Sequence, residues 1–224
     1  MKKTIFLASI LSLTLYGAQA QFTISQDIVG TPVGTKPEKT FIGSEYLYKD
    51  FVKGHVLQAD STYYNNMELN YNVFTDKLIF LKNGQEMDFK FPVREFQIIK
   101  STSPAQLDIF RNGFPAFGSY TDKSYYMVLN SGKVLALKKP VKSIVENTPY
   151  GAAKVQKTVV NGEQYFLLKD GKIEKIKKDK KDLLNALSDK KDALTEFIKD
   201  KKLSFKSDDD VKALLDYYNS LTGS

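Results

Sequence analysis

The stretch that decides the fold class is YFLLKDGKI, residues 165–173. Apolar residues lead into an Asp-Gly pair, and a second short apolar segment follows it. Asp-Gly and Asn-Gly pairs tolerate the positive φ values that a tight two-residue hairpin requires. The similar stretch YMVLNSGKV occupies residues 126–134, and residues 81–84 carry the same turn chemistry. The pattern predicts antiparallel hairpins that reuse one good turn; a duplicated binding hairpin is the alternative.

Alternation of apolar and polar residues extends this prediction to residues 41–176. The clearest cases are residues 67–71 and 88–91, where every second position is apolar. The spacing between turns is too short for crossover helices, which disfavours a parallel α/β sheet. We therefore expect an antiparallel β meander over 41–176 that curves into an open barrel or a sandwich. Its turn dipeptides are Asn83-Gly84, Asn112-Gly113, Ser131-Gly132, Asn161-Gly162 and Asp170-Gly171.

After Ile176 the apolar period changes from that of strands to that of helices. We expect a helical segment over 177–224: a first helix over 177–187, a second capped by Ser188 and a third beginning after Ser207. Such amphipathic helices need a surface to pack on, so we expect them to dock on the sheet or to close one end of it. Their apolar stripes are Leu183, Leu184 and Leu187; Ala193, Leu194, Phe197 and Ile198; and Val211, Leu214, Leu215, Tyr218 and Leu221.

The N-terminus has the three parts of an export signal. Lys2 and Lys3 precede an apolar stretch over 5–16, and Ala18-Gln19-Ala20 follows it. The apolar stretch is shorter than the ~20 residues that span a bilayer. We therefore predict a signal peptide over 1–20 that is cleaved between Ala20 and Gln21, and a protein that is periplasmic or secreted. Residues 21–40 are rich in Gly and Pro and predict a linker or a loosely attached first strand.

The composition excludes several classes of site. The 224 residues contain no Cys, and His55 is the only His. Disulfide frameworks, thiol nucleophiles, Cys-based zinc sites and triads with two histidines are therefore excluded. A hydrophobic content of 42% is that of a folded globular protein.

A lysine-rich segment accounts for much of the formal charge of +7. Such a segment could attract anionic lipid or an anionic polymer. The alternative is a solvated helix face on which acidic residues alternate with the lysines. Nucleic acid is not expected, because the protein is predicted to be exported and has no Arg-and-aromatic recognition motif. The segment, called the lysine patch below, comprises Lys172, Lys175, Lys177, Lys178, Lys180 and Lys181.

Three further groups could carry function. Asp208, Asp209 and Asp210 lie where a helix dipole favours acids, so with Ser207 they predict a capping box and not a cation site. His55 could act as a base or a pH-sensitive group, and a pair of acids could hydrolyse a glycoside. Exposed tyrosines could bind protein or sugar, although Tyr is also common in strands. The acids are Glu45, Asp50, Asp60 and Asp76, and the tyrosines are Tyr46, Tyr48, Tyr63, Tyr64, Tyr71, Tyr120, Tyr125 and Tyr126.

Two stretches together resemble a set of exported proteins of Bacteroidota that have no assigned activity. The first spans residues 54–80 and includes Tyr63, the run Leu69-Asn70-Tyr71-Asn72 and Asp76; the second runs from 165–171 to 217–221. The resemblance implies a bacterial envelope location and transfers no site residue.

The sequence thus favours a non-enzymatic envelope protein, a binding or structural module that holds a protein or an apolar ligand on a curved sheet or a tyrosine-rich edge. No catalytic, cofactor or metal residue is assigned, and no cofactor is expected. Two alternatives stay open: an envelope hydrolase with a carboxylate pair near His55, and an electrostatic anchor formed by the lysine patch.

Overall fold

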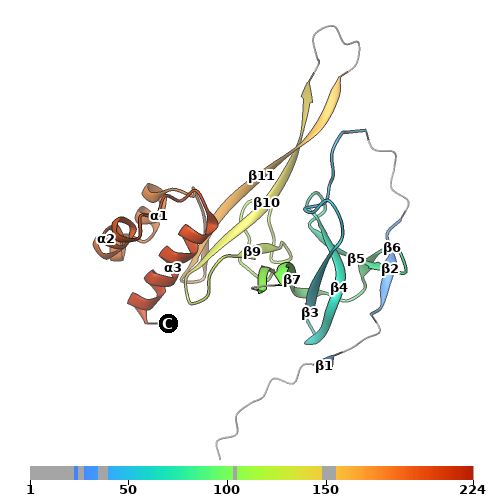
Figure 1. Ribbon diagram of the computed structural model, residues 1–224, viewed down its shortest axis with the longest axis horizontal. Helices are drawn as coiled ribbons and strands as arrows, with labels where there is room; N and C mark the ends of the chain where they lie inside the picture. The colour runs from blue at the N-terminus through green and yellow to red at the C-terminus, as the bar shows by residue number, and fades with distance from the viewer. Residues whose placement is uncertain (1–22, 25–27, 35–39, 103–104, 148–154, 224) are drawn as a thin grey trace, which may run out of the picture.

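The computed structural model describes residues 23–24, 28–34, 40–102, 105–147 and 155–223. Within these ranges one large, mainly antiparallel sheet is followed by three α-helices (Figure 1). The fold class predicted from the sequence, mainly β with C-terminal helices, is confirmed. The strands are β1 (Thr23–Ile24), β2 (Gly30–Pro32), β3 (Val52–Gln58), β4 (Thr62–Asn72), β5 (Lys77–Lys82), β6 (Gln85–Phe89), β7 (Val93–Thr102), β8 (Ala105–Arg111), β9 (Tyr126–Val128), β10 (Leu135–Asn147), β11 (Gln156–Lys169) and β12 (Lys172–Ile176).

The strand order shows two meanders joined side by side. It runs β12-β11-β10-β9-β8-β7-β3-β4-β5-β6-β2, so β7 pairs with β3 and not with β6, the strand before it. The described sheet does not close on itself, because β12 and β2 are its two edges. The segment 21–40 supplies β2, which pairs with β6, and β1, which pairs in parallel with β4.

Of the five predicted hairpin turns, two are confirmed, one lies in a longer hairpin loop and two are wrong. Asn83-Gly84 joins β5 to β6 and Asp170-Gly171 joins β11 to β12, with positive φ at both residues of each pair. Asn161-Gly162 instead lies inside β11, opposite Lys142 and Val141. Asn112-Gly113 follows β8 and opens the long loop to β9. Ser131-Gly132 lies in the loop between β9 and β10, which is longer than a two-residue turn.

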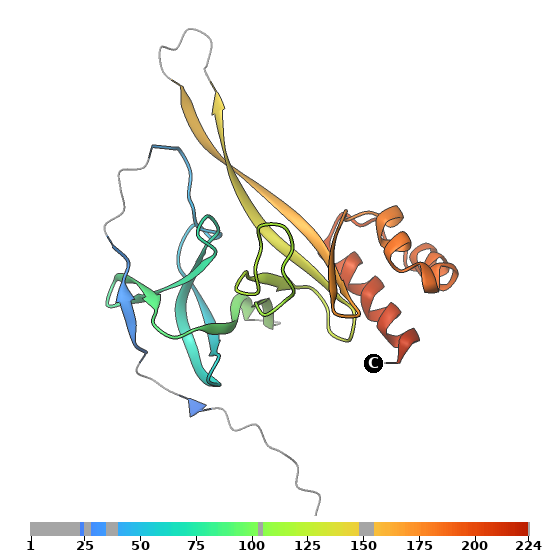
Figure 2. The ribbon, with the colours of Figure 1, turned by 180° about the vertical axis from the view of Figure 1, so that it is seen from behind.

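Strands β10 and β11 form the longest hairpin, with an unbroken register from Leu135↔Leu168 to Asn147↔Gln156. The distal part of this hairpin, residues 141–147 and 155–161, projects away from the body and is called the arm below (Figures 1 and 2). The base of the hairpin is buried on both faces. Ala136 and Leu167 pack with the helices, whereas Leu137 and Phe166 pack against the aromatic loop between β8 and β9.

The helices are α1 (Lys180–Ala186), α2 (Lys191–Lys201) and α3 (Asp208–Thr222), with a 3-10 turn over Ser188–Lys190. They pack on the β10–β12 end of the sheet, and a second core fills the space among β3–β8. Most of the predicted stripe residues are buried there, but Leu221 is exposed. None of the helices in the described ranges is long and apolar enough to cross a membrane.

The predicted helix caps differ in outcome. Ser188 does not cap α2: it begins the 3-10 turn, and α2 starts after Lys190 with no side-chain cap. Ser207 does cap α3, because its side chain accepts a hydrogen bond from the backbone N–H of Asp210. The capping box is only half formed, since the Asp210 carboxylate accepts from the backbone N–H groups of Ser204 and Phe205 and not from Ser207.

Candidate functional site

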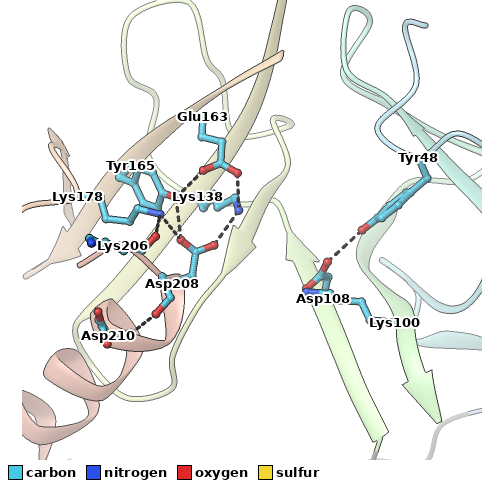
Figure 3. A network of polar contacts seen from close by, with 11 residues as sticks. Tyr48, Lys100, Asp108, Lys138, Glu163, Tyr165, Lys178, Lys206, Asp208 and Asp210 are labelled. Carbon is cyan, nitrogen blue, oxygen red and sulfur yellow. Dashed lines mark hydrogen bonds and ion pairs between the residues drawn. The ribbon is translucent and has the colours of Figure 1, made fainter. Parts of the chain in front are cut away.

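A groove runs along one face of the sheet between β8 and helix α3. Its wider part has a volume of about 580 Å³ and lies between the exposed edge of β8 and the first turn of α3. A narrower part of about 410 Å³ continues from Tyr48 to the base of the arm. Both parts are lined by Asp108, Met127 and Lys138. Figure 3 shows the polar side chains of its two walls.

The α3 wall contains a closed ring of polar contacts. Lys138 Nζ lies 2.7 Å from Glu163 Oε1 and 2.7 Å from Asp208 Oδ2. On the other side of the ring, the Tyr165 hydroxyl lies 2.7 Å from Glu163 Oε2 and 2.7 Å from Asp208 Oδ1 (Figure 3). Tyr165 has one hydroxyl proton, so it donates to one carboxylate at a time. Lys178 adds a second positive charge 3.1 Å from Asp208, and the ring has no net charge.

The ring keeps its two acids ionised. Burial alone would raise the pKa of Asp208 and of Glu163, but hydrogen bonds from Lys138 and Tyr165 outweigh it and lower both pKa values. Burial likewise would lower the pKa of Lys138, and the two acids raise it above its usual range. A general acid needs a pKa raised toward neutrality. These two carboxylates are shifted the other way, so the pair is suited to charge recognition and to anchoring α3, and not to proton donation.

The opposite wall is built on β8. Asp108 accepts a hydrogen bond from the Tyr48 hydroxyl at 3.1 Å, and Lys100 lies 3.4 Å from it (Figure 3). Burial, and then the charge of Asp108, raise the pKa of Tyr48 far above its usual value, so this hydroxyl stays protonated.

The edge of β8 that faces the groove is mostly unpaired in the described structure. β9 pairs with β8 only at Phe110↔Met127 and Arg111↔Tyr126. The Asn112 N–H donates to Arg94 on the β7 side. Because backbone groups alternate in direction along a strand, those of Leu107 and Ile109 both point away from β7. Ile109 lies opposite Val128 of β9, so of these two residues it is Leu107 whose backbone groups are open to the groove. Leu107 is also 41% exposed.

The opposite face of the hairpin base holds a second buried ion pair. Lys139 is 3% exposed and donates to Asp76 Oδ2 at 2.7 Å, to the Tyr71 hydroxyl at 2.9 Å and to the Tyr125 carbonyl at 2.8 Å. Its ammonium also lies within 5.6 Å of the ring centres of Tyr71, Tyr120 and Tyr126. All three of its donors are therefore used. Burial lowers the pKa of Lys139, and the charge of Asp76 opposes that shift.

The lysine patch is only partly free. Lys172, Lys175, Lys177, Lys180 and Lys181 are exposed on β12 and around the start of α1. Lys178 is half-buried and is bound to Asp208 and to the Lys206 carbonyl. Lys178 therefore belongs to the polar ring.

Of the acids and the histidine proposed for hydrolysis, Asp76, Asp60 and His55 make separate local contacts. Asp76 is bound to Lys139, and Asp60 accepts from the Thr62 N–H in a turn. His55 Nδ1 lies 3.4 Å from the Asn66 N–H, and its ring stacks on Tyr63. Glu45 is buried, and the carbonyl of Asp50 accepts from the Asn70 side chain. Among the described residues no cluster of three or more His, Asp or Glu could hold a metal ion.

Of the two interpretations of the tyrosines, the exposed platform is wrong for most of them, because they are packed in the core. Tyr71 and Tyr126 are fully buried, and Tyr46, Tyr64 and Tyr125 are less than 10% exposed. Tyr48, Tyr63 and Tyr120 are half-buried. The β-strand preference of Tyr explains their abundance.

Sequence reasoning missed Lys138, Lys139 and Glu163. One signal for the lysines was present: two adjacent charges follow the apolar run Leu135-Ala136-Leu137 inside a strand. Adjacent residues of a strand point to opposite faces, so one lysine had to enter each face of the hairpin base. Glu163 had no such signal, since it follows a Gly in a segment that resembled a turn.

Comparisons with protein-family models, curated proteins and solved structures find no match to this chain. The predicted cleavage residues Ala20 and Gln21 lie outside the described residues.

Proposed function

We propose that the protein is an exported, non-enzymatic binding module of the bacterial envelope that holds an extended peptide segment of a partner protein. The peptide lies in the groove and adds as a strand to the edge of β8. The observation that carries this proposal is the short β9, which covers one end of that edge and leaves Leu107 open to the groove.

Strand addition supplies affinity through main-chain hydrogen bonds and specificity through alternate side chains. The groove offers both. The backbone groups of Leu107 provide hydrogen bonds, and its side chain offers an exposed apolar contact. The charged side chains that line this part of the groove beyond the ring are Lys100, Asp108, Arg111, Asp209 and Lys212. This mixture suits a peptide that carries charges of both signs.

The first test separates strand addition from other modes of binding. Short random peptides are selected on the immobilised protein, and the best binder is resynthesised with single backbone N-methyl groups at each position in turn. In strand addition only every second peptide N–H faces β8, so N-methylation should abolish binding at alternate positions. A failure to select any binder, or losses without this period, would refute the proposal.

A matched pair of variants tests the location. Lys212→Glu reverses a half-exposed charge in the groove, and Lys201→Glu reverses an exposed charge at the end of α2, away from the groove. The first variant should change the affinity for the selected peptide and the second should not. Equal effects would place the peptide elsewhere.

The export part of the proposal rests on the sequence pattern of residues 1–20. We expect the protein recovered from the periplasm or the medium to begin at Gln21, which mass spectrometry of the intact chain measures. Retention of residues 1–20 on protein in those fractions would refute cleavage without affecting the groove.

A further inference from the structure

The arm concentrates exposed apolar side chains. The described residues include ten large hydrophobic side chains that are exposed. Five of them lie on the arm or on the segment that crosses it: Ile42, Ile144, Val145, Val155 and Val160. Exposed apolar side chains concentrated on a projecting element mark an interaction site or an aggregation liability.

The arm also has an open backbone edge. Beyond Lys138 the described strands leave β10 without a partner on the side away from β11. The Leu129 N–H donates to the Ala136 carbonyl at 3.0 Å, so the backbone groups of Ala136 point to that side. The β10–β11 register has no bulge, and the alternation therefore continues to residues 142, 144 and 146. Pro140, which has no N–H, falls on the same edge before these residues, as is usual for Pro in edge strands.

We propose that two copies of the protein pair through this edge, antiparallel and with a two-fold axis at Ile144. The three outward-facing residues, Lys142, Ile144 and Glu146, then form three hydrogen-bonded pairs with the second copy. Ile144 lies opposite its own symmetry mate. Lys142 of each copy lies opposite Glu146 of the other, on the same face of the sheet, because residues i and i+2 of a strand share a face.

Charge complementarity selects this register over its neighbours. An axis at residue 142 places lysine opposite lysine, and an axis at 146 places glutamate opposite glutamate. An axis at residue 143 or 145 places a charged residue opposite Ile144. Opposite charges on directly paired residues stabilise a ladder, and like charges destabilise it. Only the axis at Ile144 matches both charges and the apolar residue.

The contacts that Glu146 and Lys142 make within one copy leave both side chains able to pair with the second copy. Glu146 is bound to Lys157 at 2.9 Å, and both side chains are about half exposed. Such a surface pair contributes little, so Glu146 can also accept Lys142 of the second copy. Lys142 Nζ donates to the Ser44 carbonyl at 3.0 Å, lies near enough to Glu45 to be attracted by its charge, and has further donors available.

The first experiment uses the absence of Cys from the chain. Paired residues in a hydrogen-bonded antiparallel pair have Cα atoms about 5.5 Å apart, within the range that a disulfide spans. The full chain from an exporting host, carrying Ile144→Cys, should form a covalent dimer on mild oxidation. Val160→Cys is the control, because Val160 is equally exposed on β11 of the same arm. Absence of the Ile144→Cys dimer, or equal crosslinking of both variants, overturns the proposal.

The second experiment tests the register by exchanging charges. Wild-type protein should dimerise in sedimentation over a concentration series. Glu146→Lys creates two lysine pairs across the axis and should weaken the dimer about tenfold. Lys142→Glu should do the same, although it also loses the Ser44 contact. The double variant Lys142→Glu/Glu146→Lys restores complementarity and should recover dimerisation. A wild type that stays monomeric at all concentrations, or a double variant as weak as the single variants, overturns the proposal.

Discussion

Replacing Asp76 with asparagine should destabilise the protein more than replacing its partner Lys139 with methionine. The two side chains form one ion pair but differ in burial: the Lys139 side chain is 4% exposed and that of Asp76 is 27% exposed. Asp76→Asn leaves a charge in the core without its counter-charge. Lys139→Met removes the buried charge, keeps most of the packing volume and leaves Asp76 partly hydrated.

The magnitudes follow from this asymmetry. Removing one partner of a buried pair costs about 3–5 kcal/mol, because the other charge is left uncompensated. Lys139 keeps its hydrogen bonds to Tyr71 and Tyr125, so Asp76→Asn should lower the free energy of unfolding by about 3 kcal/mol. In Lys139→Met, Asp76 still accepts from the Tyr71 hydroxyl and the Tyr125 N–H, and the cost should be about 1 kcal/mol. The double variant should resemble Lys139→Met.

Urea denaturation followed by circular dichroism measures these differences, with unchanged m values as the check that the denatured state is the same. The pH dependence provides an independent readout. Burial lowers the pKa of Lys139 in the folded protein, and the loss of Asp76 lowers it further. Between that lowered pKa and the ordinary lysine value of about 10.4, the unfolded chain binds a proton that the folded chain has released, so raising the pH favours folding. Asp76→Asn should therefore regain stability relative to Lys139→Met as the pH rises. A larger loss in Lys139→Met, or equal pH profiles, would refute the reasoning.

Three further outcomes are expected. The pKa values of Asp208 and Glu163 are lowered in the folded protein. Their contribution to stability is therefore complete above the ordinary carboxyl range of about 4 and is lost as the pH falls through the lowered values. Asp208→Asn should flatten the acid unfolding curve, and an unchanged slope would contradict this. Gly54→Ala should cost about 3 kcal/mol in urea denaturation, because a Cβ there would overlap the Gln97 carbonyl and lie 2.7 Å from Leu69, whereas Gly34→Ala, with open space around it, should cost nothing. If the lysine patch is an anchor, binding to phosphatidylglycerol vesicles should disappear as salt is raised through ~0.2 M; salt-insensitive binding would exclude that role.

The sequence predicts those parts of this fold that depend on local chemistry. Asp170-Gly171 specifies its turn, because both residues need positive φ and few other pairs tolerate it. Ser207 specifies the start of α3 in the same local way. Asn161-Gly162 has the same chemistry but lies in a strand, since thirteen consecutive residue pairs with β10 outweigh one turn preference.

The rest depends on contacts that no short window contains. The pairing of β7 with β3 joins residues about forty positions apart. The sequence of neither strand predicts which other strand it pairs with. The candidate site has the same origin: Lys138 lies on β10 and Asp208 on α3, 70 positions apart in sequence. The alternation around Lys138 and Lys139 could have predicted that both enter the core, but not with which acids they form ion pairs.

The hairpin base also constrains the order of assembly. Ala136 and Leu167 form one face of the hairpin base and pack with the helices, and Leu137 and Phe166 form the other face and pack with the aromatic loop. Neither of these two clusters can form before β10 and β11 have paired. A hairpin of neighbouring strands forms in microseconds, whereas β3 must wait for β7, which lies much further along the chain. The C-terminal half can therefore act as a preformed template, and the longer-range pairings of β3 with β7 and of β2 with β6 become the slow steps that complete the sheet.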